Sequence, residues 1–165
     1  MVKSQNPPTL KYLAFDLNGT TVYKGEGTAN LVAYYPYGID INETKLMPSS
    51  SATEVKATNL GDLEVPLKIK VPSNVGDLTI SLYNEKGSMV GRIVLSSVTT
   101  YSGITHFLID SKTCLIEGLN NNAVTGQLFN SCITSGDFFK LPPGRNRLVF
   151  SKECEKTISY FNLYY

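Results

Sequence analysis

Side chains that often carry chemistry are scarce in this sequence of 165 residues, which has no tryptophan, one histidine and three cysteines. The absence of tryptophan weakens any aromatic platform on which a sugar ring would stack. A cysteine–histidine nucleophilic pair requires a base. The only candidate, His106, lies in a strand-like run with no neighbour that would activate it. We therefore expect a structural histidine.

The cysteines argue against two further classes of protein. Cys114, Cys132 and Cys154 are odd in number and widely spaced, which disfavours both a disulfide framework and a zinc site. A free cysteine usually behaves as a small apolar side chain in a protein interior. We expect all three residues to be buried free thiols.

Charge is also scarce, because 18% of the residues are charged and the net charge is +1. This balance gives no bulk attraction to nucleic acids or to membrane surfaces. The first residues are polar and lack the apolar core of a signal peptide, and no apolar run approaches transmembrane length. We expect no nucleic-acid partner, no membrane partner and synthesis in a cytoplasm.

The acidic and glycine-rich segments do not predict catalysis. Carboxylates such as Asp62, Glu85 and Glu117 fall in turns or on solvent-facing strand positions, where surface roles are usual. Gly25-Glu26-Gly27 lacks the pattern of a phosphate loop, and no helix follows it. The sequence predicts that the protein is not an enzyme and has no catalytic residues, no cofactor and no metal site.

Residues that favour β-strands are abundant, with ten tyrosines, seven phenylalanines and a hydrophobic share of 42%. Alternating segments follow one another between Gly, Pro and Asn turns, which is typical of an antiparallel β-sandwich. Ser88–Thr99 could be helix or strand, and we predict strand. The expected strands of the sandwich are Ala52–Thr58, Leu63–Val71, Asp77–Tyr83, Met89–Leu95, His106–Asp110, Thr113–Glu117, Ala123–Phe129, Arg147–Phe150 and Thr157–Tyr164.

A short hairpin arm is expected before the sandwich. Lys11–Asp16 and Thr21–Lys24 flank Asn18-Gly19, a pair that supplies the positive φ of a tight hairpin turn. Thr28–Tyr35 follows as a longer strand with apolar residues on both faces.

Met47–Ser51 has the composition of a linker. The predicted organisation is therefore all-β, with an N-terminal β arm over residues 1–45 and a β-sandwich domain over residues 46–165.

Ser135–Phe150 is the strongest turn signal in the chain. Pro142-Pro143-Gly144 fits a tight turn, because proline presets φ and glycine adopts positive φ at little cost, and Asn146 extends it. Asp137 is expected to bond nearby backbone N–H groups. We interpret the segment as a fold determinant carried by Gly136, Asp137, Phe138, Phe139, Leu141, Pro142, Pro143, Gly144 and Asn146.

Three segments, in a shared order, resemble the distal tail proteins of siphophages. Gly136–Asn146 is similar to the signature G-D-x-F-x-L-x-P-G-x-N, Tyr23–Tyr37 to Y-x-G-x-G-T followed by D-P-Y, and Asn59–Pro66 to N-x-G-x-x-x-x-P. The resemblance implies a phage tail or baseplate component. In that family an N-terminal belt forms a ring, usually a hexamer, and a C-terminal galectin-like or jelly-roll-like sandwich holds receptor-binding or fibre proteins.

The chain departs from this pattern in two ways. Most of the belt is absent, and Tyr35-Pro36-Tyr37 stands where the family has D-P-Y. We expect a fragment or a short relative in which the outward adaptor role is better supported than the ring. The resemblance also implies a virion protein, assembled in the bacterial host cytoplasm as a homo-oligomer with other tail and baseplate proteins.

Two groups of residues are candidates for an interface. Tyr34, Tyr35 and Tyr37 form a tyrosine cluster, and tyrosine is enriched at interfaces because it offers contact area and a hydrogen bond. Arg145 and Arg147 flank the proline turn and are either solvated charges or partners of a neighbouring subunit. Contact between subunits, internal packing and carbohydrate binding all remain open for the tyrosines. The alternative function is a carbohydrate-binding module that recognises host-surface glycans.

Overall fold

The computed structural model describes residues 11–17, 20–26, 38–96 and 102–164. The chain divides into two compact units, Met1–Gly38 and Ile39–Tyr165, and each is described by itself.

The described part of the first unit is a β-hairpin. Strand β1 (Lys11–Leu17) pairs antiparallel with β2 (Thr20–Glu26), and Leu17 stands opposite Thr20. The predicted hairpin is therefore confirmed. The expected strand Thr28–Tyr35 lies outside the described residues.

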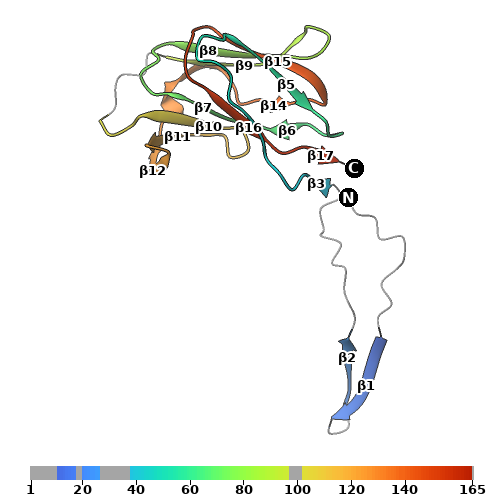
Figure 1. Ribbon diagram of the computed structural model, residues 1–165. Helices are drawn as coiled ribbons and strands as arrows, with labels where there is room; N and C mark the ends of the chain where they lie inside the picture. The colour runs from blue at the N-terminus through green and yellow to red at the C-terminus, as the bar shows by residue number, and fades with distance from the viewer. Residues whose placement is uncertain (1–10, 18–19, 27–37, 97–101, 165) are drawn as a thin grey trace. The chain divides into compact units, whose positions relative to one another are not determined.

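The second unit is an antiparallel β-sandwich, as the sequence predicted, and its two sheets lie in separate layers (Figure 1). The six-stranded sheet has the order β12 (Ala123–Leu128), β11 (Leu115–Asn120), β10 (His106–Asp110), β7 (Lys68–Pro72), β16 (Thr157–Tyr160) and β4 (Thr44–Leu46). The five-stranded sheet has the order β13 (Ile133–Gly136), β9 (Met89–Leu95), β8 (Leu78–Tyr83), β15 (Gly144–Phe150) and β5 (Glu54–Asn59).

Short elements complete the sandwich. Strand β14 (Lys140–Leu141) pairs with β6 (Val65–Pro66), and β17 (Leu163–Tyr164) pairs with β3 (Gly38–Ile39). A 3₁₀ turn, η1 (Asn130–Cys132), precedes β13.

The core lies between the two sheets because alternate strand residues point inward. In the six-stranded sheet, the strand register brings Ile158, Ile69, Ile109 and Ile116 into one row, and all four are buried. Burying each such side chain contributes about 1.5–3 kcal/mol. The five-stranded sheet supplies the opposing layer with Ile80, Leu82, Ile93, Leu95, Leu148 and Phe150.

Two predicted strands are each divided in the structure. Leu63–Val71 forms β6 and β7, because Leu67 leaves one pairing for the other and exchanges hydrogen bonds with Ser111. Thr157–Tyr164 is interrupted at Phe161–Asn162, so β16 joins the six-stranded sheet and β17 pairs with β3. The alternation of apolar and polar residues continues through such breaks, so the sequence does not show where a strand changes its pairing partner.

Strand β4 spans the predicted boundary between residues 45 and 46. It pairs with β16 in the six-stranded sheet and lies in the compact unit Ile39–Tyr165. The expected linker, Met47–Ser51, is held against the sandwich by Lys156, which is 1% exposed. Its ammonium donates hydrogen bonds to the carbonyl oxygens of Ser49, Ser50 and Ala52 and lies 5.3 Å from the centre of the Phe150 ring. All three ammonium donors are satisfied, which permits this burial.

The expectation of three buried thiols is wrong for one of them. Cys132 and Cys154 are buried, but Cys114 is exposed, with φ of 55°, in the turn between β10 and β11. Asn121 and Asn122, in the turn between β11 and β12, both adopt positive φ. All three cysteines are free.

Candidate functional site

Gly136 begins the turn motif with a backbone that only glycine fits. Its φ is 80°, and a Cβ atom there would overlap the carbonyl of Arg92. The next residue, Asp137, donates its N–H to the same carbonyl, and its carboxylate accepts from the N–H of Phe138 at 2.7 Å. The predicted bond from Asp137 to nearby backbone is confirmed.

Phe138 and Phe139 cover one end of the core. Both are partly buried and pack against it, around a small cleft lined also by Leu67, Ile93 and Ile109. Phe139 lies so close to Gly91 that a Cβ atom at that glycine would overlap its ring.

The proline turn is held from within by an asparagine. Pro142 and Pro143 connect β14 to β15, which begins at Gly144 with φ of 89°. The buried Asn146 donates its Nδ2 hydrogens to the carbonyls of Pro142 at 2.8 Å and Gly144 at 2.9 Å. The residue lies within β15, so it stabilises the turn through its side chain.

A second motif segment joins the first through Asn59. Its Nδ2 donates to the carbonyls of Leu63 at 2.7 Å and Leu141 at 3.0 Å, and its Oδ1 accepts from the N–H of Gly61. A Cβ atom at Gly61 would overlap the backbone of Leu163. We call residues 59–63, 136–146 and 162–163 together the motif corner.

The C-terminal strand closes the motif corner. Asn162 accepts the N–H of Leu60 at 3.0 Å and donates to the carboxylate of Asp40 at 2.7 Å. The N–H of Asp62 bonds the carbonyl of Leu163 at 2.8 Å. The corner is therefore a network of buried side-chain amides and backbone groups, which is suited to fixing a fold.

Of the candidate interface residues, the structure describes the two arginines, and their surroundings differ. Arg147 forms an ion pair with Glu54 at 3.1 Å and lies 4.8 Å from the centre of the Tyr83 ring. Arg145, opposite Thr58 in the pairing of β15 with β5, is exposed. Tyr34, Tyr35 and Tyr37 lie outside the described residues. Arg145 is exposed, whereas Arg147 is partly covered through its contacts with Glu54 and Tyr83.

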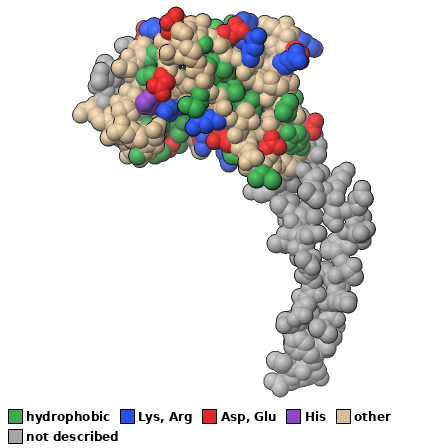
Figure 2. Space-filling view, viewed as in Figure 1, with side chains coloured by type: hydrophobic (Ala, Val, Ile, Leu, Met, Phe, Trp, Pro, Cys, Tyr) green, Lys and Arg blue, Asp and Glu red, His purple; other side chains and the backbone are tan. Residues whose placement is uncertain are grey.

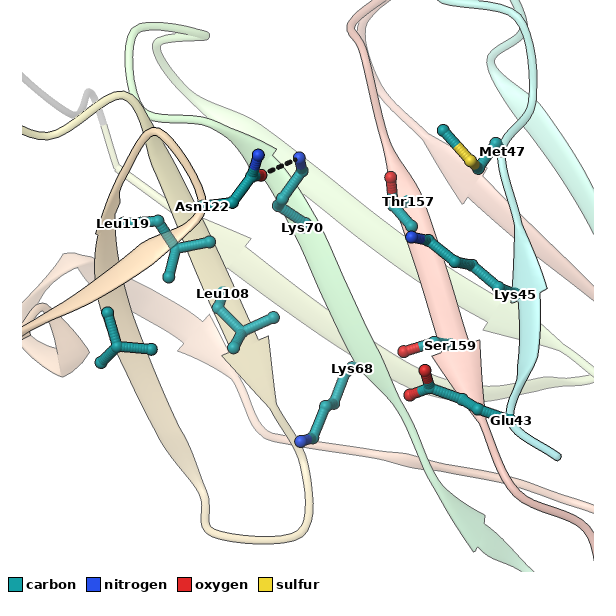
Figure 3. A pocket seen from close by; sticks show the side chains of 11 residues that line it. Glu43, Lys45, Met47, Lys68, Lys70, Leu108, Leu119, Asn122, Thr157 and Ser159 are labelled. Carbon is teal, nitrogen blue, oxygen red and sulfur yellow. Dashed lines mark hydrogen bonds between the residues drawn. The ribbon is translucent and has the colours of Figure 1, made fainter. Parts of the chain in front are cut away.

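Sequence reasoning missed a groove on the outer face of the six-stranded sheet (Figure 3). It encloses about 560 Å³ and crosses the sheet from β4 to β12. We call it the basic groove. Its lining is Glu43, Lys45, Met47, Lys68, Lys70, Leu108, Leu119, Asn122, Val124, Thr157 and Ser159.

Strand register explains why these side chains meet. Lys70 stands opposite Leu108 on one side and Thr157 on the other, so the three project from the same face. Ser159 stands opposite both Lys68 and Lys45. The alternation of Lys68 and Lys70 was visible in the sequence, but the strands that face them were not.

The lysines differ in their partners. Lys68 lies 3.7 Å from the carboxylate of Asp110, which also accepts the N–H of Lys112. Lys70 donates to Oδ1 of Asn122 at 2.8 Å, a neutral partner. Among the described residues, no carboxylate lies within ion-pair distance of Lys45 or Lys70.

His106 lies close enough to Lys70 for the charge of that lysine to affect its pKa. Its pKa is lowered from 6.5, first by burial and then by the charge of Lys70, while Glu155 acts in the opposite direction. Its Nδ1 lies 3.0 Å from the hydroxyl of Thr105, and its Nε2 lies 4.0 Å from Glu155. In Figure 2 the histidine, in purple, lies beside both an acidic and a basic side chain.

The described part of the chain contains neither a metal-binding cluster nor a membrane-spanning helix. No cluster of His, Cys, Asp and Glu side chains there could hold a metal ion. No helix in that part of the chain has the length and apolar character needed to cross a bilayer.

Comparisons with known proteins find the fold and not a sequence family. No family model matches the chain, and no curated protein matches its sequence. Among solved structures, the chain is similar to the SPP1 Dit protein, described as a paradigm of hub adsorption apparatus in phages that infect Gram-positive bacteria. The TM-score is 0.59 at 16% identity, over 94% of this chain and 59% of that protein. The chain thus shares the fold of this Dit protein and spans about three fifths of that protein's length.

Proposed function

We propose that this chain is a structural component of a phage tail tip or baseplate, acting as an adaptor that connects the tail to receptor-binding or fibre proteins. The observation that carries the proposal is the similarity of fold to a tail hub protein along 94% of the chain. The motif corner supports it independently, because two of the three segments that resemble distal tail proteins bond each other through Asn59 and Leu141.

The mechanism is assembly by surface complementarity, with no reaction. Its partners are other tail and baseplate proteins and further copies of the chain, hexameric where the ring of the family is retained. Its location is the virion. Arg145 and the tyrosines at 34, 35 and 37 are the candidate contacts, and Arg145 has the exposure that this role requires.

Native mass spectrometry and light scattering test this proposal on the full chain, alone and mixed with tail proteins encoded beside it. We expect an oligomer or a stoichiometric complex. Arg145→Glu should weaken assembly, whereas Lys86→Glu, in the exposed turn between β8 and β9, should leave it unchanged. A strict monomer in every mixture would refute the assembly role.

The alternative function, carbohydrate recognition, draws on a different observation. The basic groove offers hydroxyl, amide and charged groups together with apolar side chains, which is the mixture a small-molecule site needs.

A further inference from the structure

We propose that the basic groove binds an acidic saccharide, meaning a sugar that carries a carboxylate or a phosphate. This rests on the alternative function, carbohydrate recognition, and names its ligand class. It does not depend on the structural role, because the described residues that line the groove belong to one chain.

The charge of the groove favours an anion. Three of its lining residues are lysines and one is a glutamate. Lys45 and Lys70 lack a carboxylate within ion-pair distance among the described side chains, so a ligand's acid group would meet cations that are not already neutralised. Burial first, and the charge of Lys70 second, lower the pKa of His106, while Glu155 acts in the opposite direction.

The nearby acidic residues that the structure describes do not form ion pairs with Lys45 or Lys70. Asp110 is largely buried and engaged with Lys68 and with the backbone of Lys112. Glu117 stands opposite Leu108, on the other side of it from Lys70. Glu43 is exposed at the β4 end, where its carboxylate can accept hydrogen bonds from sugar hydroxyls.

The neutral lining favours a saccharide over a peptide. The groove crosses the middle of a sheet face, where backbone groups are already paired between strands, so a peptide could not extend the sheet there. The hydroxyls of Thr157 and Ser159 lie between the lysines and can bond ligand hydroxyls (Figure 3). Leu108 and the exposed Val124 offer apolar surface to the C–H groups of a sugar ring.

Calorimetric titration of the full chain tests the proposal with two pairs of probes. Digalacturonate is compared with its neutral methyl ester, and trehalose 6-phosphate with trehalose. At least one acid should bind with a Kd of about 1 mM or tighter, and its neutral counterpart should bind at least about tenfold more weakly. The two acids distinguish a carboxylate ligand from a phosphate ligand. Affinity should fall with added salt.

Matched variants locate the binding. Lys45→Gln with Lys70→Gln should weaken binding of the acid at least about tenfold, and Lys68 is left intact because it pairs with Asp110. Lys56→Gln with Lys86→Gln removes the same charge from exposed positions outside the groove. The proposal is overturned if neither acid binds by about 10 mM. It is also overturned if the neutral probes bind equally well, or if the control pair loses as much affinity as the groove pair.

Discussion

The motif corner and the basic groove are both built from short strands and turns, but the polar side chains of the corner bond the backbone, whereas those of the groove face solvent. In the motif corner, Asn59 and Asn146 are buried and bond only backbone groups of the same chain. In the basic groove, Lys45 and Thr157 face solvent from a sheet whose backbone is already paired. The residues that resemble a family are thus the ones the architecture requires, whereas ligand contacts would lie elsewhere.

Gly136→Ala should have the largest effect on this comparison. The new methyl group would overlap the carbonyl of Arg92 at a φ of 80°, so we expect a loss of roughly 3 kcal/mol or more in the free energy of unfolding. Gly87→Ala is the control, because its φ is 78° and nothing lies within 4 Å of the new atom. It should cost about 1 kcal/mol. Equal losses in urea denaturation would show that backbone conformation alone, and not close packing, governs Gly136.

Asn59→Ala should cause the second-largest loss of stability. It leaves the carbonyls of Leu63 and Leu141 and the N–H of Gly61 without their side-chain partner, at a cost of roughly 2–4 kcal/mol. Asn84→Ala removes bonds to two N–H groups in an exposed turn and should cost less than about 1 kcal/mol. Hydrogen exchange should show opening of residues 59–63 in the first variant alone. Unchanged protection there would contradict a role for Asn59 in joining the two motif segments.

His106 should give a small dependence of stability on pH. Because its pKa is lowered in the folded chain, the unfolded chain binds more protons as the pH falls below 6.5. The contribution of His106 is therefore present above 6.5 and is lost as the pH falls through the window down to its folded pKa. Urea midpoints between about pH 7.5 and pH 5 should decline less steeply in His106→Gln than in the unaltered chain. If the urea midpoints of both proteins decline equally with pH, the protonation of His106 does not affect stability.

The Lys45→Gln and Lys70→Gln pair should have the smallest effect on stability, within about 0.5 kcal/mol, because neither lysine forms an ion pair with a described carboxylate. Thermal unfolding of the same preparations used for titration measures this directly. A large loss would mean that the groove lysines support the fold, and the contrast with the motif corner would fail.

Much of the fold could be predicted from local sequence. Alternation identified strands such as β8, because this signal depends on a few adjacent residues. The pairing of β4 with β16, and the hydrogen bonds from Lys156 to the carbonyls of Ser49 and Ser50, join positions more than a hundred residues apart, so no local pattern indicates them. The exposure of Cys114 depends in the same way on where its turn lies.

By itself, the sequence determined the all-β class, the hairpin and the turn motif, because period-two alternation and the φ preferences of Gly, Pro and Asn act locally. Only the tertiary structure decided which strands are neighbours. That choice placed Leu141 against Asn59 and set Lys45, Lys70 and Thr157 on one face. Strand pairing between distant segments has no local signature, because it depends on which faces bury together when the two sheets close on the core.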